Sequence, residues 1–360
     1  MDFAGIRVGL VGPLPPPAGG MANQTRQLAE LLQSAQAQVT LVQTNAPYRP
    51  LWAGRVPGVR AVFRLFPYLA ALWHAAGRSD VLHIMANSGW SWHLFAAPAI
   101  WMGRLRGVPS VVNYRGGEAA EFLQGAQAVV RQSMAATAGL LVPSAFLQEV
   151  FARFGMPAAI VPNIIDLARF HSRGTKVAQS VHIVVARNLE PLYDNATAIR
   201  AFQTVHMQWP QAFLTIAGSG PQEAALRQLV SDLGLQACVR FTGRLDRDAI
   251  AALYREADIM LNPSLADNMP NSVLESLASG VPVVSTDVGG VPYIVQDGVT
   301  ALLVPPGDPQ AMAAACLRLL DDTGLWTRLQ QAGLVEVQRY TWSQVAPVLA
   351  AHYRQVIQAK

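Results

Sequence analysis

The sequence predicts an α/β fold of two doubly wound domains, and three observations carry this prediction. Short apolar runs of strand length alternate with stretches of helical periodicity along the chain, as in parallel sheets covered by helices. The 360 residues suit two domains, and 51% hydrophobic against 14% charged residues supplies apolar material for two cores. The polar stretch HSRGTKVAQS at 171–180 has the composition of a linker. We therefore expect domains over 1–172 and 173–340, followed by a terminal helix over 341–360.

Cysteine usage and the first residues of the chain bear on its compartment. Cys238 and Cys316 are far apart and have no CxxC or His-rich partner spacing, which argues against zinc and for a reducing compartment. The opening MDFAGIRVGLVGP has no basic n-region, and no run of eighteen apolar residues without charge occurs. We expect a cytoplasmic protein.

Charge is distributed unevenly between the two halves. Residues 1–170 hold 13 Arg against 7 acids, whereas residues 171–360 hold 14 Arg or Lys against 16 acids. A basic first half suits nucleic acid, an anionic membrane surface or a phosphorylated substrate. No DNA- or RNA-binding motif accompanies the charge, so nucleic acid ranks last and we expect no nucleic-acid partner.

The first predicted strand, 6–11, runs into a proline- and glycine-rich loop and then a helix. Gly19 and Gly20 stand at the helix entrance, where absent side chains let a ligand approach the backbone and the helix N-terminus favours anions. The alternative is a plain strand-to-helix turn. The loop is not GxGxxG, and no acidic residue closes a second strand near 39–42, so a Rossmann oxidoreductase is not supported.

The segment 51–77 mixes five aromatic residues with three arginines and has the character of a basic amphipathic surface. Such segments lie at membrane interfaces. Pro57 and Pro67 are expected to interrupt any single helix, so two short core helices with extended arginines are the alternative. Peripheral contact with an anionic membrane is therefore a hypothesis.

The strands predicted at 81–85 and 110–113 end in small and polar residues, where α/β folds bind ligands. Arg115 follows the second of them. Its guanidinium stays protonated and cannot act as a base, so we interpret it as stabilising the charge of a donor or acceptor phosphate. A salt bridge to Glu118 or Glu121 is the alternative. His83 lies inside a strand and is expected to be a core residue.

The second half repeats this pattern of strands and loops. Arg187 directly follows the strand 181–186, and a fixed planar cation suits a diphosphate. Two further predicted strands, 213–217 and 239–242, end at a close-approach loop with Gly218 and Gly220 and at Gly243-Arg244.

The stretch 258–290 contains the most informative pattern, read as strand, loop, helix and strand. The helix entrance at Asn268–Asn271 offers backbone N–H groups to a phosphate. Asp267 and Glu275 flank that point, and since carboxylates repel phosphate, they are better suited to sugar hydroxyls on either side of it. Otherwise Asp267 is a loop-starting cap and Glu275 a solvated helix residue. The candidate donor contacts here are Asn268, Met269, Asn271, Ser272 and Glu275.

Asp267-x7-Glu275 and the phrase V-P-N-x-x-D-x-x-x-F at 161–170 resemble retaining GT-B glycosyltransferases of the family 4 type, the glycosyl transferases group 1. The resemblance implies a GT-B fold: two Rossmann-like domains facing a central cleft, with a C-terminal helix crossing back to the first domain. It also implies a nucleotide sugar on the second domain, an acceptor on the first, and catalytic roles for Arg187, Asp267 and Arg115. By the same resemblance, the loops that carry Gly218, Gly220 and Arg244 frame the base and diphosphate of the donor.

The chain departs from the family pattern at several positions. The first carboxylate is Asp where the family usually has Glu, and no Lys follows Arg187 within a few residues. Arg115-Gly116 stands where a His-Gly pair is common, and Tyr293 and Ala301 replace the more usual Glu and Gly.

The sequence thus predicts a retaining, metal-independent hexosyltransferase that uses a UDP- or GDP-sugar and no cofactor. Its acceptor would be a saccharide or a lipid-linked hydroxyl, in cell-surface polysaccharide or glycoconjugate synthesis. Two rivals remain: a GT-B sugar-nucleotide epimerase, which needs no acceptor, and a non-enzymatic membrane-surface binding protein, which leaves Asp267, Glu275 and Arg187 unexplained.

Overall fold

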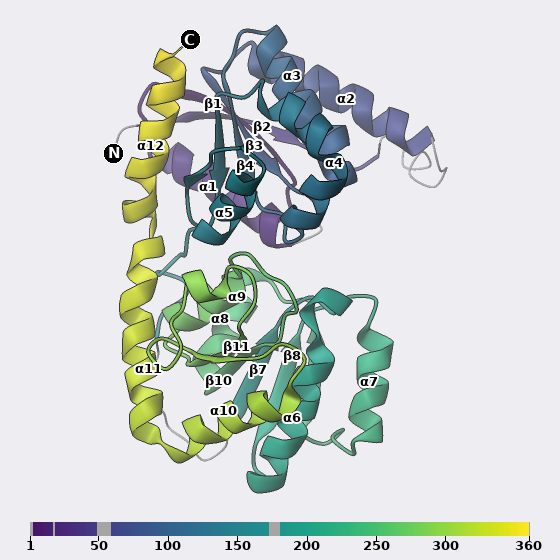
Figure 1. Cartoon of the computed structure of the whole chain (residues 1–360), viewed down its shortest axis with the longest axis vertical. Coiled ribbons are helices and arrows are strands. Elements are labelled where there is room, and N and C mark those ends of the chain that lie inside the picture. Colours follow the sequence, from purple (N-terminus) through teal and green to yellow (C-terminus); the bar gives the residue numbers. More distant parts are fainter. Residues whose placement is uncertain (1–2, 17–18, 49–58, 173–180, 360) are drawn as a thin grey trace. The chain divides into compact units, whose positions relative to one another are not determined.

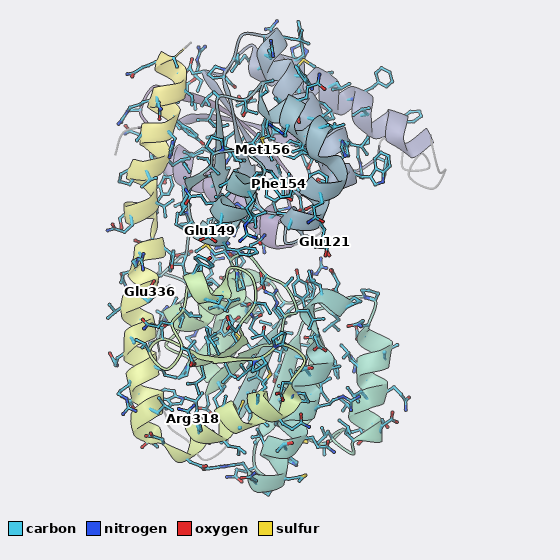
Figure 2. The ribbon with its side chains drawn as sticks, viewed as in Figure 1. Glu121, Glu149, Phe154, Met156, Arg318 and Glu336 are labelled. Carbon is cyan, nitrogen blue, oxygen red and sulfur yellow. The ribbon has the colours of Figure 1, made fainter. Side chains whose placement is uncertain are left out.

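The computed structural model describes residues 3–16, 19–48, 59–172 and 181–359 (Figure 1). Two compact units are formed by Met1–Ile164 with Trp342–Lys360, and by Ile165–Thr341. Each unit is built on a six-stranded sheet with helices packed on it. Figure 2 shows side chains filling the space between each sheet and its helices. The predicted α/β class with two doubly wound sheets is confirmed.

The sheet of the first unit is parallel and has the order β2-β1-β3-β4-β5-β6. The chain adds β2 on one side of β1 and then β3 on the other, so the strand order reverses between β1 and β3. Its strands are β1 Arg7–Gly12, β2 Gln38–Gln43, β3 Val81–Ala86, β4 Ser110–Tyr114, β5 Gly139–Val142 and β6 Ala159–Ile160.

Alternating apolar side chains build a core on each face of this sheet. In β3, Leu82 and Ile84 join one cluster while Val81 and Met85 join the other, because successive strand residues point to opposite faces. The helices of the unit are α1 Gly20–Ser34, α2 Val59–Ala76, the π-helical turn η2 Trp92–Ala96, α3 Ala97–Leu105, α4 Ala119–Met134, α5 Ala145–Arg153 and α12 Trp342–Gln358.

The last helix belongs to the first unit, although the chain reaches it from the second. Helix α12 buries Val345, Leu349 and Tyr353 in the cluster that also holds Val8 and Leu10 of β1. The predicted return of the terminal helix to the first domain is therefore confirmed.

The sheet of the second unit is also parallel, in the order β12-β11-β10-β7-β8-β9. Here the order reverses between β7 and β10. The strands are β7 His182–Ala186, β8 Phe213–Ala217, β9 Val239–Gly243, β10 Ile259–Asn262, β11 Val283–Thr286 and β12 Leu302–Val304. The helices are η3 Pro191–Tyr193, α6 Asn195–Gln208, α7 Glu223–Asp232, α8 Arg247–Glu256, α9 Asn271–Ala278, η4 Val291–Tyr293, α10 Pro309–Asp321, α11 Thr323–Glu336 and η5 Val337–Tyr340.

The two units divide at Ile164 and Ile165, before the expected boundary at residue 172. Contacts explain the earlier division. The Ile165 N–H donates to the Tyr340 carbonyl at 2.9 Å, and Phe170 is buried in the core of the second unit. Of the expected linker 171–180, residues 173–180 lie outside the described residues.

Helix α2 differs from the expected pair of short helices. It runs unbroken over Val59–Ala76 with Pro67 inside it, so the predicted interruption at Pro67 is wrong. Pro57 lies outside the described residues. Tyr68 and Leu72 pack into the core and hold the helix in place, so tertiary packing outweighs the local cost of the proline.

Candidate functional site

Several predicted site residues of the second unit meet where its strand order reverses. Arg187 directly follows β7, and Asp267 lies in the loop that follows β10; β7 and β10 are paired neighbours in the sheet. Ligands of open α/β sheets bind outside the carboxyl ends of the strands at such a reversal. The topology therefore places Arg187 and Asp267 at the preferred ligand position of this unit.

The guanidinium of Arg187 is held from three directions. Nη2 donates to the Asp267 carboxylate in an ion pair, and Nη1 donates to Ser272 Oγ at 3.2 Å. The ring of Tyr193 lies 4.0 Å from the guanidinium carbon, a cation–π arrangement. The side chains of Arg187 and Asp267 are only 9% and 13% exposed. The sequence analysis selected both residues but did not anticipate that they pair with one another.

The loop that carries Asp267 is fixed by its neighbours. The Gly290 N–H donates to the Asp267 carbonyl at 2.8 Å, and a Cβ at Gly289 or Gly290 would overlap the carbonyl oxygens of Asp267 and Asn268. Asp267 Oδ1 accepts the Asn268 N–H at 3.0 Å. The two glycines are therefore required by close backbone packing, which fixes the loop at the entrance to α9.

Helix α9 begins at Asn271, with Pro270 as its N-cap and no side-chain cap hydrogen bond. Pro270 therefore stands one position before the first helical residue, Asn271. The N-terminus of a helix favours an anion at this position, through the orientation of its backbone N–H groups and the helix dipole. Asn268, Met269 and Ser272, predicted as donor contacts, are buried at this entrance.

Glu275 lies one turn into α9 and is only partly exposed. Its carboxyl interacts electrostatically with Arg187 and Arg247, which brings it into the same cluster. Burial raises the pKa of Glu275 to about 7, and the nearby cations Arg247 and Arg187 oppose that rise. When ionised, this carboxylate accepts hydrogen bonds, so a ligand with hydroxyl donors would suit it.

The glycines after β8 have a local packing role. A Cβ at Gly218 or Gly220 would overlap the carbonyl oxygens of Arg187 and Leu189. These glycines let the two loops touch, and their contact with a donor stays a prediction. Arg244, after β9, has an exposed side chain.

In the first unit, Gly19 is the N-cap of α1 and Gly20 its first residue. Apart from its chain neighbours, no atom of the described residues lies within 4 Å of a Cβ built on Gly19, so on that side there is space for a ligand beside the backbone. The neighbouring residues 17 and 18 lie outside the described residues.

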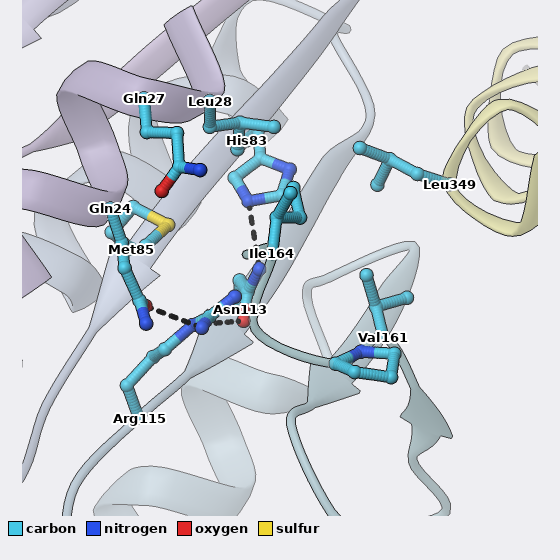
Figure 3. Close-up of a pocket in the computed structure, with 11 residues that line it drawn as sticks. Gln24, Gln27, Leu28, His83, Met85, Asn113, Arg115, Val161, Ile164 and Leu349 are labelled. Atoms are coloured by element: carbon cyan, nitrogen blue, oxygen red, sulfur yellow. Dashed lines mark hydrogen bonds between the residues drawn. The ribbon is translucent and has the colours of Figure 1, made fainter. Parts of the chain in front are cut away.

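Arg115 of the first unit lines a small cavity, where its guanidinium lies beside the side chains of Gln24 and Asn113 (Figure 3). It donates to the amide oxygens of Asn113, at 3.0 Å, and of Gln24 and Asn163. Amide acceptors, rather than the carboxylates of Glu118 or Glu121, therefore receive these hydrogen bonds. Burial lowers the pKa of Arg115 to about 9, which still leaves it protonated at neutral pH.

His83 lines the same cavity and is fully buried. Asn113 Nδ2 donates to its Nε2 at 3.1 Å, which leaves the proton on Nδ1, 2.8 Å from the Tyr353 hydroxyl. Burial and the charge of Arg115 lower the pKa of His83 to about 3, so it is neutral. The cavity measures about 20 Å³, room for about one water molecule. The prediction that His83 is a core residue is confirmed.

Sequence reasoning missed Tyr193, Gln24 and Asn163 as partners of the two arginines. Gln24 and Asn163 meet Arg115 across a wide sequence separation, which no local pattern signals. Tyr193 lies in the short segment after Arg187, and an aromatic residue so close to a strand-end arginine could have indicated a cation–π contact.

No group of three His, Cys, Asp or Glu side chains suited to a metal ion occurs in the described ranges. In those same ranges, no helix combines the length and the apolar character that crossing a membrane requires.

Comparison with known proteins adds to this geometry. Residues 18–169 match the family model described as Glycosyltransferase Family 4, and residues 180–322 match that described as Glycosyl transferases group 1. A phosphatidyl-myo-inositol mannosyltransferase of Mycolicibacterium smegmatis is 27% identical over 376 residues, covering 98% of this chain and 94% of that one.

Solved structures share the fold. Sucrose-phosphate synthase from Thermosynechococcus elongatus superposes with a TM-score of 0.76 at 21% identity, covering 99% of this chain and 100% of that one. HepE of Anabaena, in complex with UDP and glucose, gives 0.74 at 16% identity, covering 96% and 98%. The two domain matches, the full-length relative and the fold agree: the chain is a GT-B glycosyltransferase and belongs to the glycosyl transferases group 1 of the family 4 type.

Proposed function

We propose that this glycosyltransferase moves a hexosyl group, with retention and without a metal ion or other cofactor, from a UDP- or GDP-sugar to a hydroxyl of a saccharide or lipid-linked acceptor. The observation that carries the proposal is the cluster of Arg187, Asp267, Ser272 and Glu275 around the entrance of α9, at the strand-order reversal of the second unit. A cation and helix N–H groups suit a diphosphate, and the two carboxylates suit hydroxyls on either side of it.

The chemistry follows from this arrangement. The bond between the anomeric carbon and the diphosphate oxygen breaks, and the acceptor hydroxyl oxygen forms a new bond on the same face. The acceptor's proton passes to the departing diphosphate oxygen. Arg187 and the backbone of Asn268–Asn271 hold the charge that develops on the diphosphate, a role in which a divalent ion is not needed. Glu275 accepts hydrogen bonds from the ribose hydroxyls.

The acceptor side of the proposal rests on the first unit. Its strand order reverses between β1 and β3, and Asn87 and Ser88 follow β3. Ser88 Oγ and the Tyr114 hydroxyl lie 2.7 Å apart, and Trp90, two residues after Ser88 in the chain, is 78% exposed. Hydroxyl and amide groups and an exposed aromatic residue in one strand-end segment suit a saccharide or cyclitol ring. The mannosyltransferase relative is named for a phosphatidyl-inositol acceptor, which is consistent with that chemistry.

A panel of UDP- and GDP-sugars tests the donor assignment by thermal stabilisation. A donor present at about one hundred times its Kd should stabilise the protein by about 2.7 kcal/mol, a shift of several degrees in Tm, because it binds only the folded state. Product analysis with and without a hydroxyl acceptor then separates transfer from epimerisation, which needs none. The proposal is wrong if no nucleotide sugar raises Tm or is consumed.

Peripheral membrane contact, at the cytoplasmic face of the cell membrane, completes the proposal. Phe66 and Trp73 of α2 and Trp101 and Leu105 of α3 are exposed, and the two helices pack on one another. Arg106 lies 4.3 Å from the Trp73 ring and Arg104 lies 5.8 Å from the Trp101 ring. Exposed tryptophans with arginines over them match the needs of an anionic interface.

Vesicle sedimentation tests this surface. The protein should sediment with vesicles rich in anionic phospholipid at low salt and be released in about 0.5 M salt, because its arginines are then screened. The double variant Trp73→Ser, Trp101→Ser should bind several-fold more weakly. Met207→Ser removes an apolar side chain that is 74% exposed on the second unit and should change nothing. Equal sedimentation of the double variant and the parent would exclude α2 and α3 as the contact.

A further inference from the structure

The ion pair between Arg187 and Asp267 lies where the donor's diphosphate is proposed to bind. Arg187 offers five N–H donors. One on Nη2 donates to Asp267 and one on Nη1 donates to Ser272. Its Nε is buried and without a hydrogen-bond partner in the described part of the chain. A diphosphate that uses this guanidinium therefore enters a site whose cation already has a carboxylate partner.

Several hydrogen bonds hold Asp267 in place beside the proposed diphosphate position. Its backbone is tied to Gly290, its Oδ1 accepts the Asn268 N–H at 3.0 Å, and Ser264 Oγ lies 3.4 Å from its Oδ2. The carboxylate is therefore a fixed negative charge beside the diphosphate position. Because it is only 13% exposed, water compensates poorly for any loss of its pairing with Arg187.

A nucleoside diphosphate and a nucleotide sugar meet this carboxylate differently. The nucleoside diphosphate carries negative charge but no sugar, so it competes with Asp267 for Arg187. The charge of the Asp267 carboxylate is then only partly neutralised. The nucleotide sugar brings the same diphosphate together with hydroxyl groups that can donate to Asp267. The weakening of the Arg187–Asp267 ion pair is then offset by hydrogen bonds that the sugar hydroxyls donate to Asp267.

We infer that Asp267 is a specificity-determining residue that makes the site prefer the sugar-bearing donor over the nucleoside diphosphate product. The inference rests on the proposed function, since it requires a nucleotide sugar at α9. Once the sugar has passed to the acceptor, Asp267 loses its hydroxyl partners and re-pairs with Arg187. The ion pair thereby weakens the hold on the product and favours its release.

Calorimetric titration of UDP against UDP-glucose, and of GDP against GDP-mannose, tests the inference. In whichever of the two ligand pairs binds, the parent protein should bind the nucleotide sugar at least about tenfold more tightly than the nucleoside diphosphate. One close charge pair can supply a difference of that size. Asp267→Asn keeps the shape and removes the charge. It should bind the diphosphate about tenfold more tightly than the parent and lose most of the preference for the sugar.

The possible outcomes separate this inference from the proposed function. If the parent binds neither pair, the proposed function and the inference both fall. If the parent binds a pair without preferring the sugar, the inference alone is wrong, whether or not Asp267→Asn folds. If Asp267→Asn keeps a native Tm but binds both members more weakly by the same factor, the ion pair only supports the fold. Asp267→Glu, which keeps the charge, should retain the preference for the sugar.

Discussion

Arg187→Ala is expected to lower kcat for sugar transfer by about a hundredfold to a thousandfold, the usual cost of removing one preorganised donor from a site of developing charge. The reason is the position of Arg187 at the end of β7, beside the entrance of α9, where the diphosphate charge grows as the sugar leaves. Initial rates at saturating donor and acceptor measure the effect. Arg318→Ala, which removes an exposed arginine of α10, is the matched control and should be neutral (Figure 2).

The ion pair complicates that variant, because Arg187→Ala also strands the buried carboxylate of Asp267. Removing one partner of a buried pair costs about 3 kcal/mol or more in stability. The double variant Arg187→Ala, Asp267→Asn removes that penalty and should recover the melting temperature without recovering turnover. If the double variant regains the parent's turnover, Arg187 serves only to neutralise Asp267, and its catalytic assignment is wrong.

Local patterns were sufficient to predict the strands and the strand-end residues of the second unit. Apolar runs identify β7 and β10, and parallel strands present their carboxyl ends at one edge of a sheet, so Arg187 and Asp267 could both be selected. Their direct pairing could not be predicted. It depends on β7 and β10 being neighbours, a consequence of strand order that apolar runs do not encode.

In the first unit, too, local patterns select a residue but do not predict its contacts in the folded protein. Arg115 was selected because it follows a strand, but its direction is set by Gln24 of α1 and Asn163 after β6, which approach only in the folded unit. Helix α2 illustrates a different cause. Pro67 predicts a break from local geometry alone, yet the helix continues through it, and Tyr68 and Leu72, which both follow the proline, are buried in the core.

Glu275→Ala is expected to weaken binding of nucleotide and nucleotide sugar by about a hundredfold or more, since two hydrogen bonds from ribose to a charged acceptor are lost.

The parent's affinity for the nucleotide should also depend on pH. Burial raises the pKa of Glu275 to about 7, whereas hydroxyl donors favour its ionised form, so binding is linked to proton release. Affinity should therefore rise by up to about tenfold per unit between pH 5 and 7 and level off above.

Glu275→Gln separates this linkage from simple loss of a side chain. Because the folded-state pKa lies above the unfolded value, ionisation favours the unfolded chain, and the parent loses stability as pH rises from about 4.5 to 7. Gln cannot ionise, so the variant should equal the parent at pH 4 and exceed it by up to about 3 kcal/mol at pH 8. Urea unfolding at both pH values measures this difference, with Glu256→Gln on the exposed face of α8 as control. A variant that is less stable than the parent at pH 8 would mean that the Glu275 carboxylate stabilises the unliganded fold, and the raised pKa on which this prediction rests would be wrong.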